Sequence, residues 1–191
     1  MAFLTQEQLE GIGFASLGQH VLISDRASIY NPGAIRLGNR VRVDDYVVLS
    51  AGNGGIELGN YVHIAVFCSL LGQGRIVMED FSGLSSRVSI YSSSDDYSGA
   101  TLTNPTVPEV YKNVHHADVI LRRHVIVGAG SVLLPGVELE EGVAIGALSL
   151  VNRNCKRFGI YSGTPAKRIA ERDIGLLHKE QLLRSCSDSG G

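Results

Sequence analysis

Residues 56–70 read IELGNYVHIAVFCSL, and a small or β-branched residue recurs every six positions, followed two residues later by a larger aliphatic. The repeated positions are Ile56, Val62 and Cys68, with Leu58, Ile64 and Leu70 two residues after them. A six-residue step fits neither the period of a helix nor a strand between hairpin turns, but it fits a short strand, a corner and another short strand. Three steps return the chain to its start, so this stretch predicts one coil of a triangular β-solenoid.

The same repeat runs through most of the chain. It begins weakly near Ala15, becomes regular at Ile35 and continues to Val151. The other coils are marked by Ile35, Val41, Val47, by Ile76, Ser82, Val88, by Val119, Val125, Ser131, and by Val137, Val143, Ser149. Because stacked coils pair their backbones with one another, the sequence predicts an all-β, parallel solenoid domain over residues 15–160.

The first strand of a solenoid is unpaired on one side and needs a cover. We expect residues 1–14 to supply it as an N-terminal helical cap. Thr5 can cap a short helix over residues 5–9, and Gln8 stands three residues later, as in a capping box.

Residues 161–191 are expected to form a C-terminal extension. Within it, residues 169–183 carry an apolar stripe with charged residues outside, which predicts a second helix able to cover the other end. Residues 185–191 are small and polar, so we expect a frayed tail.

The overall composition bounds the class of protein. Charged residues make up 19% of the chain and the formal net charge is −2, which argues against a role on nucleic acid or on a membrane surface. No apolar run approaches the ~18 residues of a membrane span. Cys68 and Cys155 fall on the repeat as small core residues, which favours reduced thiols. A soluble, cytoplasmic protein is predicted, without membrane insertion and without nucleic acid.

The repeat breaks once, over residues 91–118. This segment contains Asp95-Asp96 after a run of serines, and His115-His116 just before the repeat resumes. A connection of this length inside a compact domain is uncommon and is usually functional or disordered. Its tyrosines and prolines argue against simple disorder, so we predict an extruded functional loop.

Two late motifs add to the repeat and the loop. Residues 128–137 read GAGSVLLPGV, and residues 162–167 read SGTPAK. With these, residues 15–170 resemble the hexapeptide-repeat acyltransferases, which are left-handed parallel β-helices, and most closely the galactoside and maltose O-acetyltransferases and their relatives in surface-polysaccharide and O-antigen biosynthesis. The resemblance implies a homotrimer with active sites between neighbouring prisms, and acetyl-CoA as co-substrate in a groove beside the late coils.

The cofactor residues follow from the resemblance and from the chemistry of coenzyme A. A pantetheine arm needs small side chains and open backbone groups, and Gly128-Ala129 and Gly146-Ala147 stand at equivalent corners one coil apart. Phosphates need cations nearby. The residues that match the motifs of the family are Asn152, Arg153, Pro165, Lys167 and Arg168. A plain corner is the alternative interpretation of each glycine, and a solvated charge that of Lys167.

The catalytic base is where the chain departs from these relatives. In the galactoside and maltose enzymes a loop histidine deprotonates the acceptor, but here Asp95 takes that place, followed by Asp96. A carboxyl group with a pKa of about 3.9 is a weak base unless its surroundings raise that pKa. His115 and His116 are the other candidates. Nearby carboxylates would favour a cationic amine as the acceptor.

Three further residues are candidates for substrate binding. His63 lies between Val62 and Ile64, so it points outward from a coil wall and could line the groove between subunits. Tyr91 and Tyr97 belong to the loop. His20, His124 and His178 are interpreted as surface or structural residues, and no metal site is expected.

The sequence therefore predicts an acetyl-CoA-dependent acetyltransferase. Its acceptor would be a sugar or a nucleotide-linked amino sugar, whose oxygen or nitrogen attacks the thioester directly. One alternative is a catalytically altered trimeric scaffold that binds coenzyme A. The other is a metalloenzyme like the γ-class carbonic anhydrases, which the spacing from His116 to His124 disfavours.

Overall fold

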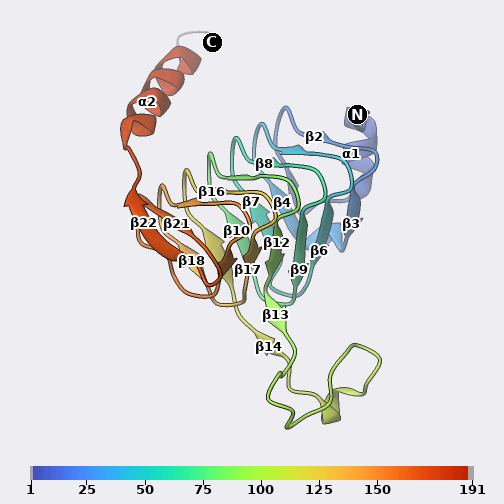
Figure 1. Cartoon of the computed structure of the whole chain (residues 1–191). Helices are drawn as coiled ribbons and strands as arrows, with labels where there is room; N and C mark the ends of the chain where they lie inside the picture. Colours follow the sequence, from blue (N-terminus) through green and yellow to red (C-terminus); the bar gives the residue numbers. More distant parts are fainter. Residues whose placement is uncertain (1, 189–191) are drawn as a thin grey trace.

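The computed structural model describes residues 2–188, and in it the chain winds into a three-sided solenoid (Figure 1). Each coil gives one strand to each of three parallel sheets. The first sheet stacks β1 (Ser16–Leu17), β4 (Ile35–Leu37), β7 (Ile56–Leu58), β10 (Ile76–Met78), β15 (Val119–Leu121) and β18 (Glu138–Leu139).

The other two sheets repeat this order. The second sheet stacks β2 (Leu22–Ile23), β5 (Arg42–Val43), β8 (His63–Ile64), β11 (Gly83–Leu84), β16 (Ile126–Val127), β19 (Ala144–Ile145), β21 (Gly159–Ser162) and β22 (Lys167–Glu171). The third stacks β3 (Ser28–Tyr30), β6 (Val48–Ala51), β9 (Ser69–Gly72), β12 (Ser89–Tyr91), β17 (Val132–Leu133) and β20 (Leu150–Val151). The predicted all-β solenoid with one extruded loop and a helix near each end is confirmed.

The repeat residues form the core of the prism. Val41, Val62, Val125 and Val143 stack in register and each is at most 1% exposed, as is Ile64 in the second sheet. This column excludes water along the whole length of the solenoid, which is why such short strands are stable. Among the residues described, Ser82 is an exception in that column, since its buried hydroxyl has no hydrogen-bond partner.

The N-terminal cap forms as expected. Helix α1 (Gln6–Ile12) starts after Thr5, whose hydroxyl accepts from the backbone N–H of Gln8, while the Gln8 side chain accepts from the N–H of Thr5. Leu9 faces the core and is buried. The helix extends three residues beyond its predicted end at Leu9, and Gly13 ends it in the left-handed conformation.

The C-terminal extension differs from the prediction. Residues 167–171 form β22, which turns back antiparallel to β21 and closes the second sheet. Helix α2 begins only at Gly175 and continues to Asp188, so the expected frayed tail is wrong as far as Asp188. Residues 189–191 lie outside the described part of the chain. The helix leaves the end of the solenoid uncovered and projects beside it (Figure 1).

Three edges join the sheets. The first–second edge carries a stacked column of Tyr61, Phe81 and His124, with ring centroids 4.8 and 5.1 Å apart. His124 also bonds Glu180 of α2 at 2.7 Å, so its predicted structural role is confirmed. The long loop leaves the prism at the third–first edge, between β12 and β15. The second–third edge carries the GAGSV motif and is described next.

Candidate acyl-transfer site

Small residues line the second–third edge over four successive coils. At the first corner position these are Ala65, Ser85, Gly128 and Gly146, and at the next position they are Val66, Ser86, Ala129 and Ala147. Backbone hydrogen bonds hold the coils in register: Ser85 N–H donates to Val127 O at 2.9 Å and Gly128 N–H to Ile145 O at 2.8 Å. We call this the small-residue edge. It offers an open backbone track of the kind a pantetheine arm requires.

The two predicted glycines have a packing reason as well. A Cβ on Gly128 would lie 2.5 Å from the backbone N of Ala147, and one on Gly146 would lie 2.9 Å from the Ser162 hydroxyl. The backbone of the next coil therefore excludes a side chain at Gly128, whereas at Gly146 the Ser162 side chain would have to move. The glycines are compatible with the predicted cofactor track, but the packing of the coils also accounts for them.

The Pro165 turn lies beside the same edge. The turn joins β21 to β22, and Ala166 N–H donates to Leu150 O at 2.8 Å while the Thr164 hydroxyl approaches Leu148 O at 3.4 Å. Lys167 pairs in register with Ser162, next to Gly146, and is exposed. The structure thus brings Pro165 and Lys167 to the predicted cofactor corner.

The remaining cofactor candidates lie elsewhere in this chain. Asn152 and Arg153 follow β20, so they stand at the third–first edge, one sheet away from Gly146. Arg168 bonds Glu171 and lies over the Tyr161 ring with its guanidinium carbon 6.0 Å from the centroid. Within one chain, these three residues are not gathered with the small-residue edge.

Beside Ser85 there is a hollow in the outer face of the second sheet. Its volume is about 290 Å³, and its lining includes His63, Gly83, Ser85 and Ile126. His63 Nε2 lies 2.9 Å from Oδ2 of Asp44, a carboxylate that also accepts from Arg42 Nε at 2.7 Å. His63 points outward as predicted. Sequence reasoning missed Asp44, Gly83 and Ser85, although all of them sit next to corners of the repeat.

The loop starts as a two-stranded ribbon. Strand β13 (Ser93–Ser94) pairs antiparallel with β14 (His115–His116), and the ribbon carries the rest of the loop away from the prism (Figure 1). His116 Nδ1 lies 2.7 Å from the Ser93 hydroxyl. His116 and Asp95 line one hollow of about 290 Å³, together with Lys112. Two of the four catalytic candidates therefore meet in this chain.

The other loop candidates are arranged differently. Asp96 accepts hydrogen bonds from Ser98 N–H at 2.8 Å and from the Thr101 hydroxyl at 3.0 Å, and these bonds lower its pKa. Because these hydrogen bonds stabilise the charged form of Asp96, its surroundings do not supply the raised pKa that a carboxylate base requires. His115 is exposed on the ribbon. Tyr91 ends β12, whereas Tyr97 is 92% exposed at the loop.

Ser85 and Asp95 are separated by the whole third sheet. Ser85 stands where the second sheet ends, and Asp95 follows the strand that leaves the third. A corner at Arg87 and the three residues of β12 lie between them, and the strand alone spans about 10 Å at ~3.3 Å per residue. In a single chain the two side chains therefore face different edges of the prism.

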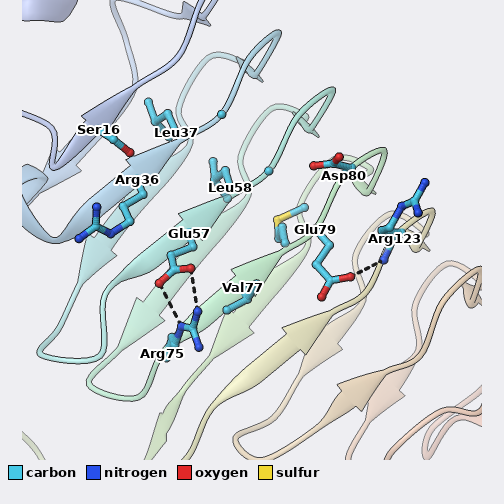
Figure 2. Close-up of a pocket in the computed structure, with 13 residues that line it drawn as sticks. Ser16, Arg36, Leu37, Glu57, Leu58, Arg75, Val77, Glu79, Asp80 and Arg123 are labelled. Atoms are coloured by element: carbon cyan, nitrogen blue, oxygen red, sulfur yellow. Dashed lines mark hydrogen bonds and ion pairs between the residues drawn. The ribbon is translucent and has the colours of Figure 1, made fainter. Parts of the chain in front are cut away.

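A larger hollow, of about 560 Å³, lies on the outer face of the first sheet (Figure 2). Its charged residues are largely paired with one another. Arg75 bonds Glu57 at 2.7 and 3.1 Å, and Glu79 accepts from Arg122 and from the backbone of Arg123. None of the predicted site residues lines it. Size alone does not supply reactive groups, so the volume of this hollow does not make it the candidate site.

The metalloenzyme alternative requires several metal ligands in one place. Among residues 2–188, no three His, Cys, Asp or Glu side chains are grouped so as to hold a metal ion. His124 is buried against Glu180, whereas His115 and His116 lie on the ribbon. No helix in this part of the chain combines the length and apolar character needed to cross a bilayer.

A parallel solenoid of six-residue steps with one extruded loop is the fold of the hexapeptide-repeat acyltransferases. No protein-family model matches the chain. Over 184 residues it is 49% identical to the dTDP-4-amino-4,6-dideoxy-D-glucose acyltransferase of Escherichia coli, an alignment that covers 96% of each protein. The chain belongs to this family of sugar-nucleotide acyltransferases and is an enzyme of that class.

Solved structures agree with the assignment. AntD, an N-acyltransferase from Bacillus cereus in complex with dTDP and 3-hydroxybutyryl-CoA, superposes with a TM-score of 0.92 at 44% identity, over 97% of this chain and 98% of that one. AntD variants with a single serine or a single aspartate substituted were crystallised with dTDP and coenzyme A. A hexapeptide-repeat acetyltransferase from Vibrio cholerae, complexed with acetyl-CoA, shares the fold at 16% identity, with a TM-score of 0.60 over 88% of this chain and 76% of that one.

Proposed function

We propose that this protein transfers an acyl group from a coenzyme A thioester to the amino group of a dTDP-linked 4-amino-4,6-dideoxy sugar. The observation that carries the proposal is the 49% identity, over nearly the whole length of both chains, to an acyltransferase named for that acceptor. The sequence left open whether an oxygen or a nitrogen of the acceptor is acylated, and we propose that it is the nitrogen. Acetyl-CoA, the co-substrate predicted from the sequence, is the simplest donor to test first.

The reacting residues are proposed to be Ser85 and Asp95. The serine and the aspartate substituted in the AntD variants lie ten residues apart. In this chain two such pairs exist, Ser85 with Asp95 and Ser86 with Asp96. Both serines line the hollow at Gly83, so the aspartates decide: Asp96 is already engaged by Ser98 and Thr101, whereas Asp95 lines the hollow beside His116. These contacts favour the first pair.

Because Ser85 and Asp95 face different edges, we propose that the site is completed by a second copy of the chain in a homotrimer. The loop of one subunit would lie on the small-residue edge of its neighbour. Its apolar side chains support this arrangement, since Leu102, Val110 and Tyr97 are 58%, 82% and 92% exposed in one chain. Large exposed apolar groups on a projecting loop are typical of an interface.

The chemistry requires little from the protein. The neutral amine attacks the thioester carbonyl, an N–C bond forms, the C–S bond breaks, and one proton moves from nitrogen to the departing sulfur. Asp95 would hold the amine by hydrogen bonding and take up that proton before it reaches the thiolate. The Ser85 hydroxyl, or a backbone N–H of the small-residue edge, would donate to the oxyanion. His116 shares the hollow with Asp95 and would orient the acceptor.

The cofactor and substrate residues are proposed on position. Gly128, Ala129, Gly146 and Ala147 would accommodate the pantetheine arm, with Pro165 and Lys167 at its phosphate end. In a trimer, Arg153, Asn152 and Arg168 could serve from another edge. We further propose that the enzyme works in the cytoplasm, in the biosynthesis of a surface polysaccharide.

The test is a thiol-release assay with acetyl-CoA and dTDP-4-amino-4,6-dideoxyglucose, with the product identified by mass spectrometry. Release of coenzyme A coupled to N-acylation supports the proposal. Acylation of a hydroxyl would point to an O-acetyltransferase. Binding of acetyl-CoA without turnover on any amino or hydroxyl sugar would instead indicate a scaffold. A sedimentation experiment reports the trimer separately.

A further inference from the structure

The outer face of the second sheet has one gap in an otherwise continuous row of side chains. The outward residues of successive strands pair in register: Arg42 with His63, His63 with Gly83, and Gly83 with Ile126. His63 and Ile126 are exposed, and Gly83 has no side chain between them. This is why a hollow opens at β11, with Gly83 as its floor.

The fold does not need glycine there. A Cβ built on Gly83 would meet only His63 O, at 3.7 Å, which is ordinary van der Waals contact. Gly83 is also absent from the residues with positive φ. By contrast, a Cβ on Gly128 would lie 2.5 Å from backbone. Glycine inside a strand costs about 0.5–1 kcal/mol relative to alanine, so the gap is maintained at some expense of stability.

The gap adjoins the proposed reaction centre. Gly83 precedes Ser85 by two residues on the same strand end, and Ser85 stands in one column with Gly128 and Gly146. Three consecutive coils span only about 10 Å at ~4.8 Å per coil. A thioester whose pantetheine arm follows this column reaches Ser85 with its acyl group next to the gap. The lining is suited to a short chain, with Ala65 and Ile126 apolar and His63 polar at the rim.

We propose that the hollow over Gly83 receives the acyl group of the donor and that the missing side chain sets the length of acyl chain accepted. The inference rests on the proposed function. It makes Gly83 a specificity-determining residue and Ile126 a wall of its pocket. His63, fixed by Asp44, presents its second ring nitrogen to a polar substituent on the chain.

The experiment compares wild type with Gly83→Ala and Gly83→Val, using acetyl-CoA and butyryl-CoA as donors. Gly33→Ala is the matched control, since a Cβ there meets nothing within 4 Å and lies in a distant turn. We expect Gly83→Val to lower kcat/KM for butyryl-CoA at least about tenfold more than for acetyl-CoA, since one or two methylenes in a pocket decide 10–200-fold. Gly83→Ala should shift the ratio in the same direction, and the control should leave it unchanged.

A binding measurement separates this inference from the proposed function. Calorimetric Kd values for coenzyme A, acetyl-CoA and butyryl-CoA need no acceptor. Gly83→Val should weaken butyryl-CoA relative to coenzyme A, at a melting temperature equal to or above that of wild type. If the wild type fails with every dTDP amino sugar, the proposed function is wrong, while the Kd ratios still decide the pocket. Unchanged kcat/KM and Kd ratios in both folded variants, or an equal shift in Gly33→Ala, would overturn it.

Discussion

The imidazole Nε2 of His63 lies 2.9 Å from Oδ2 of Asp44, so a hydrogen bond joins two adjacent coils on the outer face of the second sheet. Burial of Asp44 acts to raise its pKa, but the hydrogen bonds from Arg42 and His63 outweigh burial and hold the pKa below its ordinary value. The carboxylate therefore stabilises the fold in its charged form.

This relationship predicts a pH-dependent effect of Asp44→Asn. Because the folded pKa is lower than the unfolded one, the stabilisation is complete above the ordinary Asp pKa of 3.8 and disappears as pH falls through the folded value. We expect the variant to lose about 1–2 kcal/mol at pH 7 and to approach wild type progressively as pH falls below 3.8. Thermal unfolding across this pH range measures it. Asp25→Asn, on the same edge and exposed, is the control; a deficit that stays constant with pH contradicts the account.

The fold followed from the repeat because the repeat is a packing rule. Each small residue at the first position and each aliphatic at the second fills the same place in the next coil, so buried Val62 and Ile64 specify their neighbours as well as themselves. The C-terminal segment has no such rule. The sequence predicts a helix from Ile169, yet β21 offers an unpaired edge, and pairing with it places residues 167–171 in a strand.

The site was only partly predictable. Gly128 and Gly146 carry a motif, so the cofactor edge could be named from the sequence. Asp44 and Ser85 could not, because their importance depends on which corners stack above one another. Alignment of the six-residue steps would have shown that Ser85, Gly128 and Gly146 share one column. The proposed pairing of Asp95 with Ser85 could not be predicted from one chain, since the two residues stand on either side of β12.

The two loop carboxylates should behave differently on substitution. Asp95→Asn removes the proposed proton acceptor, so we expect kcat/KM to fall by about 100-fold or more at pH 7.5. Asp96→Asn removes hydrogen bonds from Ser98 and Thr101 and should change kcat/KM only a few-fold. Steady-state kinetics with the dTDP amino sugar checks both. A larger loss in Asp96→Asn would reassign the pair to Ser86 and Asp96.

Helix α2 is held to the solenoid by Glu180, which is 8% exposed. Burial acts to raise the pKa of Glu180, but hydrogen bonds from Arg184 and His124 and the charge of Arg123 hold it below its ordinary value. Glu180→Ala would leave His124 and Arg123 without their partner, at a cost of about 3 kcal/mol. We expect chymotryptic cleavage within α2 to become about 100-fold faster. Lys179→Ala, at an exposed neighbour, should be cleaved at the wild-type rate. Equal cleavage rates for both variants would show that Glu180 does not hold α2 to the solenoid.

The buried thiols should be unreactive. Burial raises the pKa of Cys68 and of Cys155 to about 11, so the thiolate is scarce at neutral pH. We expect iodoacetamide at pH 8 to leave both unlabelled in the native protein and to label them after unfolding, as read by peptide mass spectrometry. This matches direct transfer without an acyl-cysteine intermediate. Labelling of native Cys68 as fast as of unfolded protein would refute it.

Gly128→Ala tests whether the small-residue edge tolerates any side chain. The new Cβ would lie 2.5 Å from Ala147 N. The backbones of these two coils are held together by the hydrogen bond from Gly128 N–H to Ile145 O. The two coils must separate there, which costs about 1–3 kcal/mol and lowers the melting temperature by roughly 2–10 °C. We also expect KM for acetyl-CoA to rise while KM for the sugar changes little, because the distortion lies on the pantetheine track. Gly33→Ala should alter neither quantity. A Gly128→Ala protein with wild-type melting temperature and wild-type KM for acetyl-CoA would show that the cofactor does not follow this edge.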